Sequence, residues 1–145
     1  MFMGEYHHNI DDKGRIVIPG KFREHTAELV ITRGLEKCLY LYTKDEWDKV
    51  VKKLNTLPFT KKDARTFIRS FFAGATLCEF DRTGRINITS PLVSYADLTK
   101  ECVIIGVNDR IEIWNEKLYN EFMNENASKL EEIAENLFEV SNETL

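Results

Sequence analysis

The sequence predicts a mainly β protein with added helices, an α+β fold built from two similar halves. Three observations lead to this prediction. The segment at positions 10–18 returns at positions 80–88, where five of the nine residues are identical. Short runs of alternating apolar and polar residues, typical of β-strands, surround both copies. Longer segments with apolar residues at helical spacing follow each set of strands.

The first copy predicts two pairs of strands and then a helix. The expected elements, in order, are a strand at 6–10, a turn at 11–14, a strand at 15–18, a helical turn at 21–25 and strands at 29–32 and 38–42. Thr43 and Glu46 have the spacing of a capping box. The helix they begin bears apolar residues at helical spacing, namely Trp47, Val50, Val51 and Leu54.

A second helix is expected between the copies. Thr60 can cap it, and its apolar stripe consists of Ala64, Phe67, Ile68 and Phe71. Four basic residues lie off this stripe: Lys61, Lys62, Arg65 and Arg69. They form either a solvated helix face or part of an anion-binding surface.

The second copy predicts the same series of elements. Strands are expected at 75–80, 85–88, 102–107 and 110–114, with a helical turn that begins at Ser90 and Pro91. The closing helix carries Leu118, Tyr119, Phe122 and Met123. A last amphipathic helix, capped by Ser128 and Glu131, carries Leu130, Ile133, Leu137 and Phe138 and precedes an acidic end.

The composition is that of an ordered protein, because 43% of the 145 residues are hydrophobic and 11% are aromatic. The longest apolar runs fall well short of the roughly 20 residues that cross a bilayer, and the first residues have no signal-peptide pattern. We therefore expect a cytoplasmic protein without a membrane partner. Three cysteines without CxxC spacing lie in apolar strand segments, which predicts reduced, buried thiols at Cys38, Cys78 and Cys102.

Charge is distributed unevenly along the chain. The formal net charge is −4, but the residues from 112 to the end carry nine glutamates and two lysines. Residues 1–111 therefore hold a net charge of +3. A mildly basic body with an acidic tail is compatible with nucleic-acid binding, because attraction to phosphate depends on the local field rather than on the net charge.

The repeated segment has the pattern DxxGR in both copies. The carboxylate at the first position of a four-residue turn accepts a backbone N–H, and glycine at the fourth position tolerates the positive φ that closes a hairpin. These roles assign Asp11, Gly14, Asp81 and Gly84 to two hairpin turns. The turn chemistry leaves the following arginine unexplained.

Both arginines are expected to point away from the core. A strand period of two turns the isoleucines of each copy inward and leaves Arg15 and Arg85 outside. Arginine suits bidentate contact with phosphate or with a guanine edge, and Lys13 and Arg82 would add positive charge nearby. The alternative is that each arginine pairs with the aspartate of its own turn, a surface contact worth about 0–1 kcal/mol.

The histidines and cysteines predict no catalytic or metal site. His7 and His8 are adjacent, so that on a strand they point to opposite faces, and His25 stands alone. We therefore expect no enzyme activity, no cofactor, no bound metal and no small-molecule substrate. No ligand pocket can be inferred from the sequence.

The duplicated DxxGR segment has flanks that are specific. Together with the start MFMGEY, the phrase KGRIVIP, the segment TKKDARTFIRSFFAGA and the stretch LTKECVIIGVNDRIEIW, it closely resembles the MraZ family of bacterial transcriptional regulators. The resemblance covers residues 1 to about 138. A single DxxGR would be weak support, whereas two copies with these flanks are strong support.

The resemblance implies two SpoVT/AbrB-like swapped-hairpin domains that form a double-split β-barrel as an intramolecular pseudo-dimer. We expect residues 1–54 to form repeat 1 with its helix, 55–74 a helical linker, 75–125 repeat 2 with its helix, and 126–145 the C-terminal amphipathic helix and acidic tail. The family's DNA-contacting arginines fall on Arg15 and Arg85, with Lys13 and Arg82 as phosphate partners.

The resemblance also implies an assembly and a target. Family members form closed rings of subunits, so a homo-oligomer is expected. They bind direct repeats in double-stranded promoter DNA, usually as repressors of the division and cell-wall gene cluster, which implies association with the nucleoid. The effective concentration of tethered copies on spaced repeats would raise their affinity.

The two copies differ at two places. Pro19 follows the first GRIxI core, whereas Thr89 follows the second, whose proline is delayed to Pro91. Arg23 in the first copy corresponds to Val93 in the second. These differences predict unequal contributions to DNA contact, with the first copy stronger.

A protein-interaction module is the alternative function. Antitoxins of related swapped-hairpin architecture bind a protein partner, and the acidic tail could do the same without direct promoter binding. Such antitoxins generally carry one hairpin domain and a disordered tail. This chain has two copies of the hairpin and a helical pattern near its end, which favours the DNA-binding hypothesis.

Overall fold

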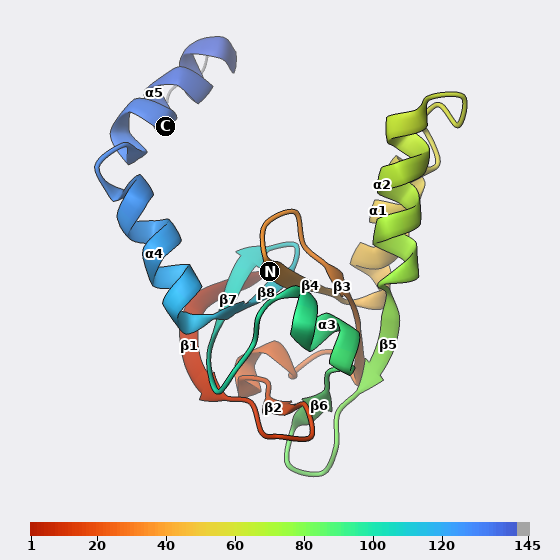
Figure 1. Cartoon of the computed structure of the whole chain (residues 1–145), viewed down its shortest axis with the longest axis vertical. Coiled ribbons are helices and arrows are strands. Elements are labelled where there is room, and N and C mark those ends of the chain that lie inside the picture. The colour runs from red at the N-terminus through yellow and green to blue at the C-terminus, as the bar shows by residue number, and fades with distance from the viewer. Residues whose placement is uncertain (142–145) are drawn as a thin grey trace.

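A computed structural model describes residues 1–141 of the chain. It has a mixed α+β fold in which an antiparallel six-stranded sheet carries a two-stranded ribbon at one end and helices on its flanks (Figure 1). The α+β prediction is confirmed. Every predicted strand and helix is present in the expected order, although several boundaries differ, and the end of the predicted acidic tail at 142–145 lies outside the described residues.

The two halves of the chain contain similar series of elements. The first half contains β1 (Phe2–Asn9), β2 (Arg15–Val17), η1 (Gly20–Phe22), β3 (Glu28–Arg33), β4 (Cys38–Tyr42), α1 (Lys44–Leu54) and α2 (Lys62–Ala73). The second half contains β5 (Thr76–Glu79), β6 (Arg85–Asn87), α3 (Ser90–Tyr95), β7 (Glu101–Asn108), β8 (Ile111–Asn115), α4 (Glu116–Ala127) and α5 (Leu130–Ser141).

The sheet interleaves the two halves in the order β1-β7-β8-β4-β3-β5. Strand β1 of the first half pairs with β7 of the second, and β5 of the second half pairs with β3 of the first. The central pair, β4 and β8, sets Leu39 opposite Ile113 and Leu41 opposite Ile111. Each half therefore supplies an edge strand to the other. The sheet is open, because β1 and β5 do not pair with each other.

The strands on either side of each DxxGR turn do not form a hairpin with each other, which corrects the expected hairpin. Strand β1 leaves to pair with β7, while β2 pairs with β6 in the separate ribbon. Only the turn itself is closed, by a 2.9 Å hydrogen bond from the Asp11 N–H to the Arg15 carbonyl. Strand β1 also begins at Phe2 rather than at residue 6, because its ladder with β7 starts at Phe2 and Asn108.

Different elements pack against the two faces of the sheet. On one face, Leu41 and its apolar neighbours pack with Ile16 and Ile86 of the ribbon in a single core. On the other face, tyrosines of β4 pack with α1 and α2, where Trp47 stacks on Phe71 with ring centroids 5.5 Å apart, and Trp114 of β8 packs against Tyr119 and Phe122 of α4. Burial of each of these side chains contributes about 1.5–3 kcal/mol.

The helices form two arms that extend away from the ribbon, α1 with α2 on one flank and α4 with α5 on the other (Figure 1). The Thr43 hydroxyl accepts the Glu46 N–H at 3.3 Å and begins α1 as predicted. Thr60 does not cap α2, whose N-cap is Lys61 without a side-chain bond. Ser128 ends α4 instead of beginning α5, which starts at Leu130.

The three cysteines are buried and unpaired, as predicted. Burial raises the pKa of all three thiols, that of Cys78 to about 12 and that of Cys102 to about 11. At neutral pH these thiols are therefore protonated and have the low reactivity of structural cysteines.

Candidate nucleic-acid interface

The β2–β6 ribbon brings together the two arginines that lie 70 positions apart in the sequence. In its register Arg15 lies opposite Asn87, Ile16 opposite Ile86, and Val17 opposite Arg85. Both isoleucines are only 1% exposed, so they mark the core face. Because residues directly opposite share a face and successive residues alternate, Arg15 and Arg85 lie on the outer face, diagonal to each other.

Each arginine is paired with the aspartate of its own turn. The distance from Arg15 Nε to Asp11 Oδ2 is 2.7 Å, and from Arg85 Nε to Asp81 Oδ2 it is 2.8 Å. The pairing that was the alternative to DNA contact is thus present. It uses only Nε, and in the described part of the chain no Nη atom of either arginine has an acceptor. With 36% and 33% of their side chains exposed, both arginines keep two amino groups available in a fixed orientation.

The first turn is built by its aspartate and glycine. Asp11 Oδ1 accepts the backbone N–H of Lys13 at 3.0 Å and that of Arg15 at 2.9 Å. Gly14 has a φ of +82° and donates its N–H to the Asp11 carbonyl at 3.1 Å. The Arg15 N–H, more than its guanidinium, lowers the pKa of Asp11, so the carboxylate stays ionised and holds the arginine at neutral pH.

The second turn repeats these contacts and adds one. Asp81 Oδ1 accepts the backbone N–H groups of Thr83 and Arg85, each at 2.9 Å. The Thr83 hydroxyl donates a further hydrogen bond of 3.0 Å to the same oxygen. Gly84 has a φ of +79°. Led by the Arg85 N–H, these donors hold the pKa of Asp81 well below its usual range.

Lys13 and Arg82 occupy different places in their turns. Lys13 is the third residue of the first turn and Arg82 the second residue of the second turn, and both are exposed. Neither side chain has an ion-pair partner among the residues that the structure describes. Both cations therefore face solvent beside the ribbon.

Arg23 is a further cation at this end of the molecule, and the exchange of strands determines its position. Its Nε donates to the Ile18 carbonyl at 2.8 Å, and its guanidinium lies against the second turn, where a Cβ added at Gly84 would lie 2.5 Å from Arg23 Cζ. Arg23 therefore sits beside the turn of the second copy. The sequence predicts that Arg23 strengthens the first copy. Its position beside the second turn could not be predicted, because the sequence pattern does not specify which strands pair.

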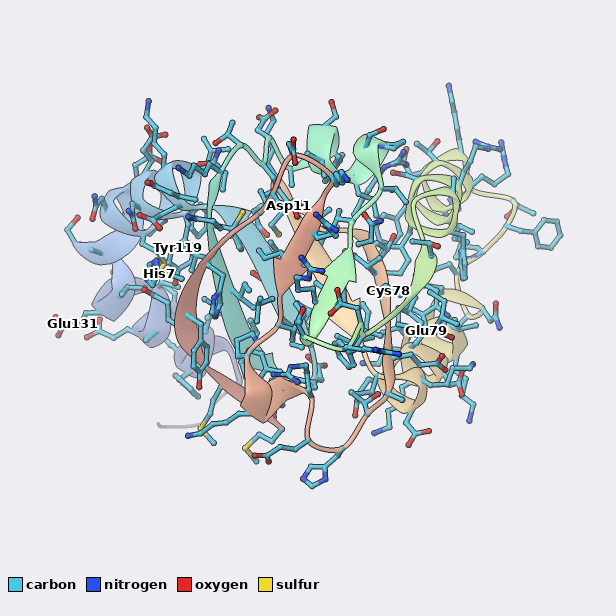
Figure 2. All side chains as sticks on the ribbon, turned by 90° about the horizontal axis from the view of Figure 1, so that it is seen from below. His7, Asp11, Cys78, Glu79, Tyr119 and Glu131 are labelled. Atoms are coloured by element: carbon cyan, nitrogen blue, oxygen red, sulfur yellow. The ribbon has the colours of Figure 1, made fainter. Side chains whose placement is uncertain are left out.

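The ribbon end of the molecule and the α4–α5 arm carry net charges of opposite sign. Around the ribbon and turns, five cationic side chains outnumber three carboxylates: Lys13, Arg15, Arg23, Arg82 and Arg85 against Asp11, Asp12 and Asp81. Residues 116–139 of the α4–α5 arm hold seven glutamates and two lysines. Figure 2 looks onto the ribbon end and shows Asp11 at the first turn, with His7 and Tyr119 together on the flank beside α4. The ribbon end is therefore basic although the whole chain is acidic.

The histidines lie apart from the ribbon. His7 makes hydrogen bonds to Glu116 at 3.0 Å and to Glu5 at 2.9 Å, and these two carboxylates, Glu116 first, raise its pKa. Over residues 1–141, no group of three or more His, Cys, Asp or Glu side chains is arranged to hold a metal ion. No helix in the described part of the chain is long and apolar enough to cross a membrane.

A comparison with protein families finds the same model twice. The model, described as "MraZ protein, putative antitoxin-like", matches residues 1–70 and again residues 71–141. This double match confirms that the chain is a duplication. Together the two matches cover all of the residues in which the sheet, the ribbon and both helical arms lie.

Proposed function

Because the chain belongs to the MraZ family of regulator-like proteins, we propose that it regulates transcription by binding double-stranded promoter DNA through the β2–β6 ribbon. The observation that carries this proposal is the outer face of the ribbon, where Arg15 and Arg85 stand together with free Nη groups. A two-stranded ribbon fits the major groove of B-DNA. The four-residue turns at both ends of the ribbon give this face little freedom to deform.

The two arginines are proposed to read bases, and their aspartates are proposed to orient them. A guanidinium that approaches guanine O6 and N7 donates two hydrogen bonds, and such a bidentate pair contributes about 1–3 kcal/mol of discrimination. The Nε contacts with Asp11 and Asp81 restrict the side-chain rotamers before binding, which reduces the entropy lost on DNA contact. Lys13 and Arg82 are proposed to contact phosphates on either side of the groove.

The exchange of β1 and β5 supports the finer fold assignment. We propose that the two halves are swapped-hairpin domains of the SpoVT/AbrB type, fused into a pseudo-dimer with the architecture of a double-split barrel. In this arrangement each half supplies one ribbon strand and one turn. The DNA-reading face therefore exists only when both halves are folded together.

We further propose that copies of the chain assemble head to tail into a closed ring. The α4–α5 arm exposes a row of apolar side chains, namely Phe122, Met123, Leu130, Ile133 and Leu137. The opposite flank exposes Leu57, Phe59, Phe72 and Leu77, next to the basic residues of α2. Two different, charge-complementary flanks favour a heterologous interface, which closes into a ring when the rotation allows. Such a ring would present several ribbons to direct promoter repeats and act as a repressor on the nucleoid.

Fluorescence anisotropy with a labelled promoter fragment that contains the direct repeats tests the function. The parent should bind with an affinity that falls steeply as salt rises, because phosphate contacts release counterions. Arg15→Ala and Arg85→Ala should each weaken binding about 5- to 150-fold, which corresponds to about 1–3 kcal/mol. Lys52→Ala, which removes an exposed charge on α1, is the matched control and should bind like the parent.

The same titration separates the two candidate functions. Variants that bind like the parent, with unchanged circular dichroism and oligomer size, would show that the ribbon is not the interface. If the parent does not bind the DNA fragment even at low salt, the result would favour the antitoxin-like interaction module. In that case the exposed apolar row on α4 and α5 is the first surface to test for a protein partner.

A further inference from the structure

We infer that a cavity beside the first turn is a binding site for a guanidinium group. The cavity has a volume of about 270 Å³ and lies between residues 10–14 and the short helix α3. It is lined by Ile10, Asp11, Asp12, Lys13, Gly14, Ile88, Ser90, Val93 and Thr99. This site goes beyond the proposed DNA contact, because it lies at the side of the turn and its lining includes neither ribbon arginine, although it shares Asp11 and Lys13 with the proposed DNA-binding surface.

The second turn shows what chemistry such a place accepts. There, the guanidinium of Arg23 lies against Gly84 and donates from Nε to the Ile18 carbonyl at 2.8 Å. The internal repeat relates Ile18 to Ile88 and Gly84 to Gly14. The same protein thus contains one copy of this environment with an arginine already bound within the chain.

At the first turn the corresponding side chain is Val93, which is too short and apolar to make that contact. The Ile88 carbonyl lies directly against the turn, since a Cβ added at Gly14 would be 2.3 Å from it. The Ile88 N–H is bonded to the Gly14 carbonyl at 2.7 Å, whereas no donor among the described residues bonds to the Ile88 carbonyl. The acceptor that Arg23 uses at one turn is therefore available at the other.

The charges around the cavity favour a cation. Asp12 stands where the second turn has Arg82, and its carboxylate has no ion-pair partner among the described residues. Ser90 and Thr99 bring hydroxyl groups to the same cavity. A carbonyl, a carboxylate and two hydroxyls can accept several N–H groups at once, which matches the planar, multi-donor guanidinium better than a compact ammonium. The lining holds two carboxylates, Asp11 and Asp12, against the single ammonium group of Lys13, so its net negative charge disfavours phosphate.

The group that binds is thus an alkylguanidinium. It could be a free small molecule of the arginine type or an arginine side chain of a neighbouring copy, because both present the same head group. Val93 would contact the planar or alkyl part of either. The experiment below uses methylguanidinium as the probe and then separates these two sources.

Equilibrium dialysis of radiolabelled methylguanidine against the full-length protein tests the site. The parent should bind one equivalent per chain, and methylammonium or inorganic phosphate should not compete. Asp12→Asn should weaken binding about tenfold, because it removes a charged acceptor. Val93→Arg should abolish binding by supplying the guanidinium from within the chain. The inference would be overturned if the parent shows no saturable binding of methylguanidine. It would also be overturned if the parent binds methylammonium equally well.

Thermal unfolding provides an independent measurement that separates filling of the cavity from recognition of the guanidinium group. Val93→Arg should unfold at a higher temperature than Val93→Met, which lengthens the side chain without adding a guanidinium. Equal melting temperatures for these two variants would count against recognition of the guanidinium. If a neighbouring copy normally supplies the arginine, Val93→Arg and added methylguanidine should both change the sedimentation of the oligomer. If the source is a small molecule, sedimentation should stay constant while L-argininamide competes with the probe.

Discussion

The first turn carries Asp12 at its second position and has a cavity beside it, whereas the second turn carries Arg82 there and is covered by Arg23. The two turns nevertheless share the same aspartate contacts and a positive φ at glycine. The residues required by the backbone and the core are thus the same in both halves. The residues that face solvent, and those that reach across from the other half, have diverged. The two halves are alike as parts of the fold and different as surfaces.

Replacement of the central ribbon isoleucines should have the largest effect, and the effect should be equal in the two halves. Ile16 and Ile86 lie directly opposite each other and are both 1% exposed. Ile16→Ala and Ile86→Ala should each lower the free energy of unfolding by about 2–5 kcal/mol, measured by urea denaturation. A large difference between the two values would mean that the halves are not equivalent even in the core.

Alanine at the turn glycines should distinguish the halves. Both glycines have a left-handed φ, which costs a side chain about 1–2 kcal/mol. A Cβ at Gly14 would also meet the Ile88 carbonyl at 2.3 Å, whereas a Cβ at Gly84 would meet the flexible Arg23 side chain. Gly14→Ala should therefore destabilise the protein by about 3 kcal/mol or more and Gly84→Ala by about 1–2 kcal/mol.

The contrast between the glycines has its own control. If Arg23 moves aside in Gly84→Ala, only the φ cost of about 1–2 kcal/mol remains. Gly84→Ala should then lower the free energy of unfolding by the same amount in the parent and in Arg23→Ala. Equal destabilisation by the two single glycine variants would contradict the different surroundings of the turns. Urea denaturation at one pH and protein concentration suffices for all of these variants.

The turn aspartates should differ in their dependence on pH. Both have a lowered pKa in the folded state, so their contribution to stability is present above the ordinary carboxyl pKa near 4 and is lost as the pH falls through the folded value. Asp81 accepts the additional Thr83 hydroxyl. Asp81→Asn should therefore lose more stability at pH 7 than Asp11→Asn, and the difference should shrink progressively as the pH falls below 4.

Thr83→Val provides the matched test for this difference, because it removes the hydroxyl donor and leaves the backbone N–H contacts. It should bring the effect of Asp81→Asn close to that of Asp11→Asn at neutral pH. Chemical denaturation at pH 7, 4 and 2 measures the effect. An unchanged gap in Thr83→Val would mean that another contact lowers the pKa of Asp81.

The smallest expected effect concerns the flank beside α4, where the first half has His7 and the equivalent position in the second half is Leu77. Glu116 and Glu5 raise the pKa of His7. Its contribution is therefore fully present below the ordinary histidine pKa near 6.5 and is lost as the pH rises through the folded value. The free energy of unfolding of the parent should fall slightly between pH 6 and pH 8. His7→Gln should not show this fall, whereas His8→Gln should show it as the parent does.

Local elements of this fold could be predicted from the sequence because their causes are local. Strand β4 occupies the predicted residues 38–42, and the Asp and Gly of each turn take part in the hydrogen bonds that their residue types favour. The start of β1 was missed because residues 2–5 include Gly4 and Glu5 and have weak alternation. That part of the strand depends on its ladder with β7, about 100 residues away.

Contacts between the halves could not be predicted from periodicity. Alternation assigns residues to a face but does not choose a partner among strands with similar patterns. The resemblance to a family implied an exchange of hairpins, but it did not place Arg23 against Gly84 or reveal the cavity beside Val93. The exposure of Arg15 and Arg85 was foreseen, whereas their simultaneous pairing with Asp11 and Asp81 was the less favoured alternative.

The exchanged edge strands also govern how the chain acquires its structure during synthesis. Strand β1 leaves the ribosome about 100 residues before its partner β7, which consists of residues 101–108. Domains that fold one by one usually complete their N-terminal part first. Here the nascent first half must keep β1, β2 and its open sheet edge unpaired until most of the chain has emerged. The complete sheet and the ribbon can therefore form only after the strands of the second half have been synthesised.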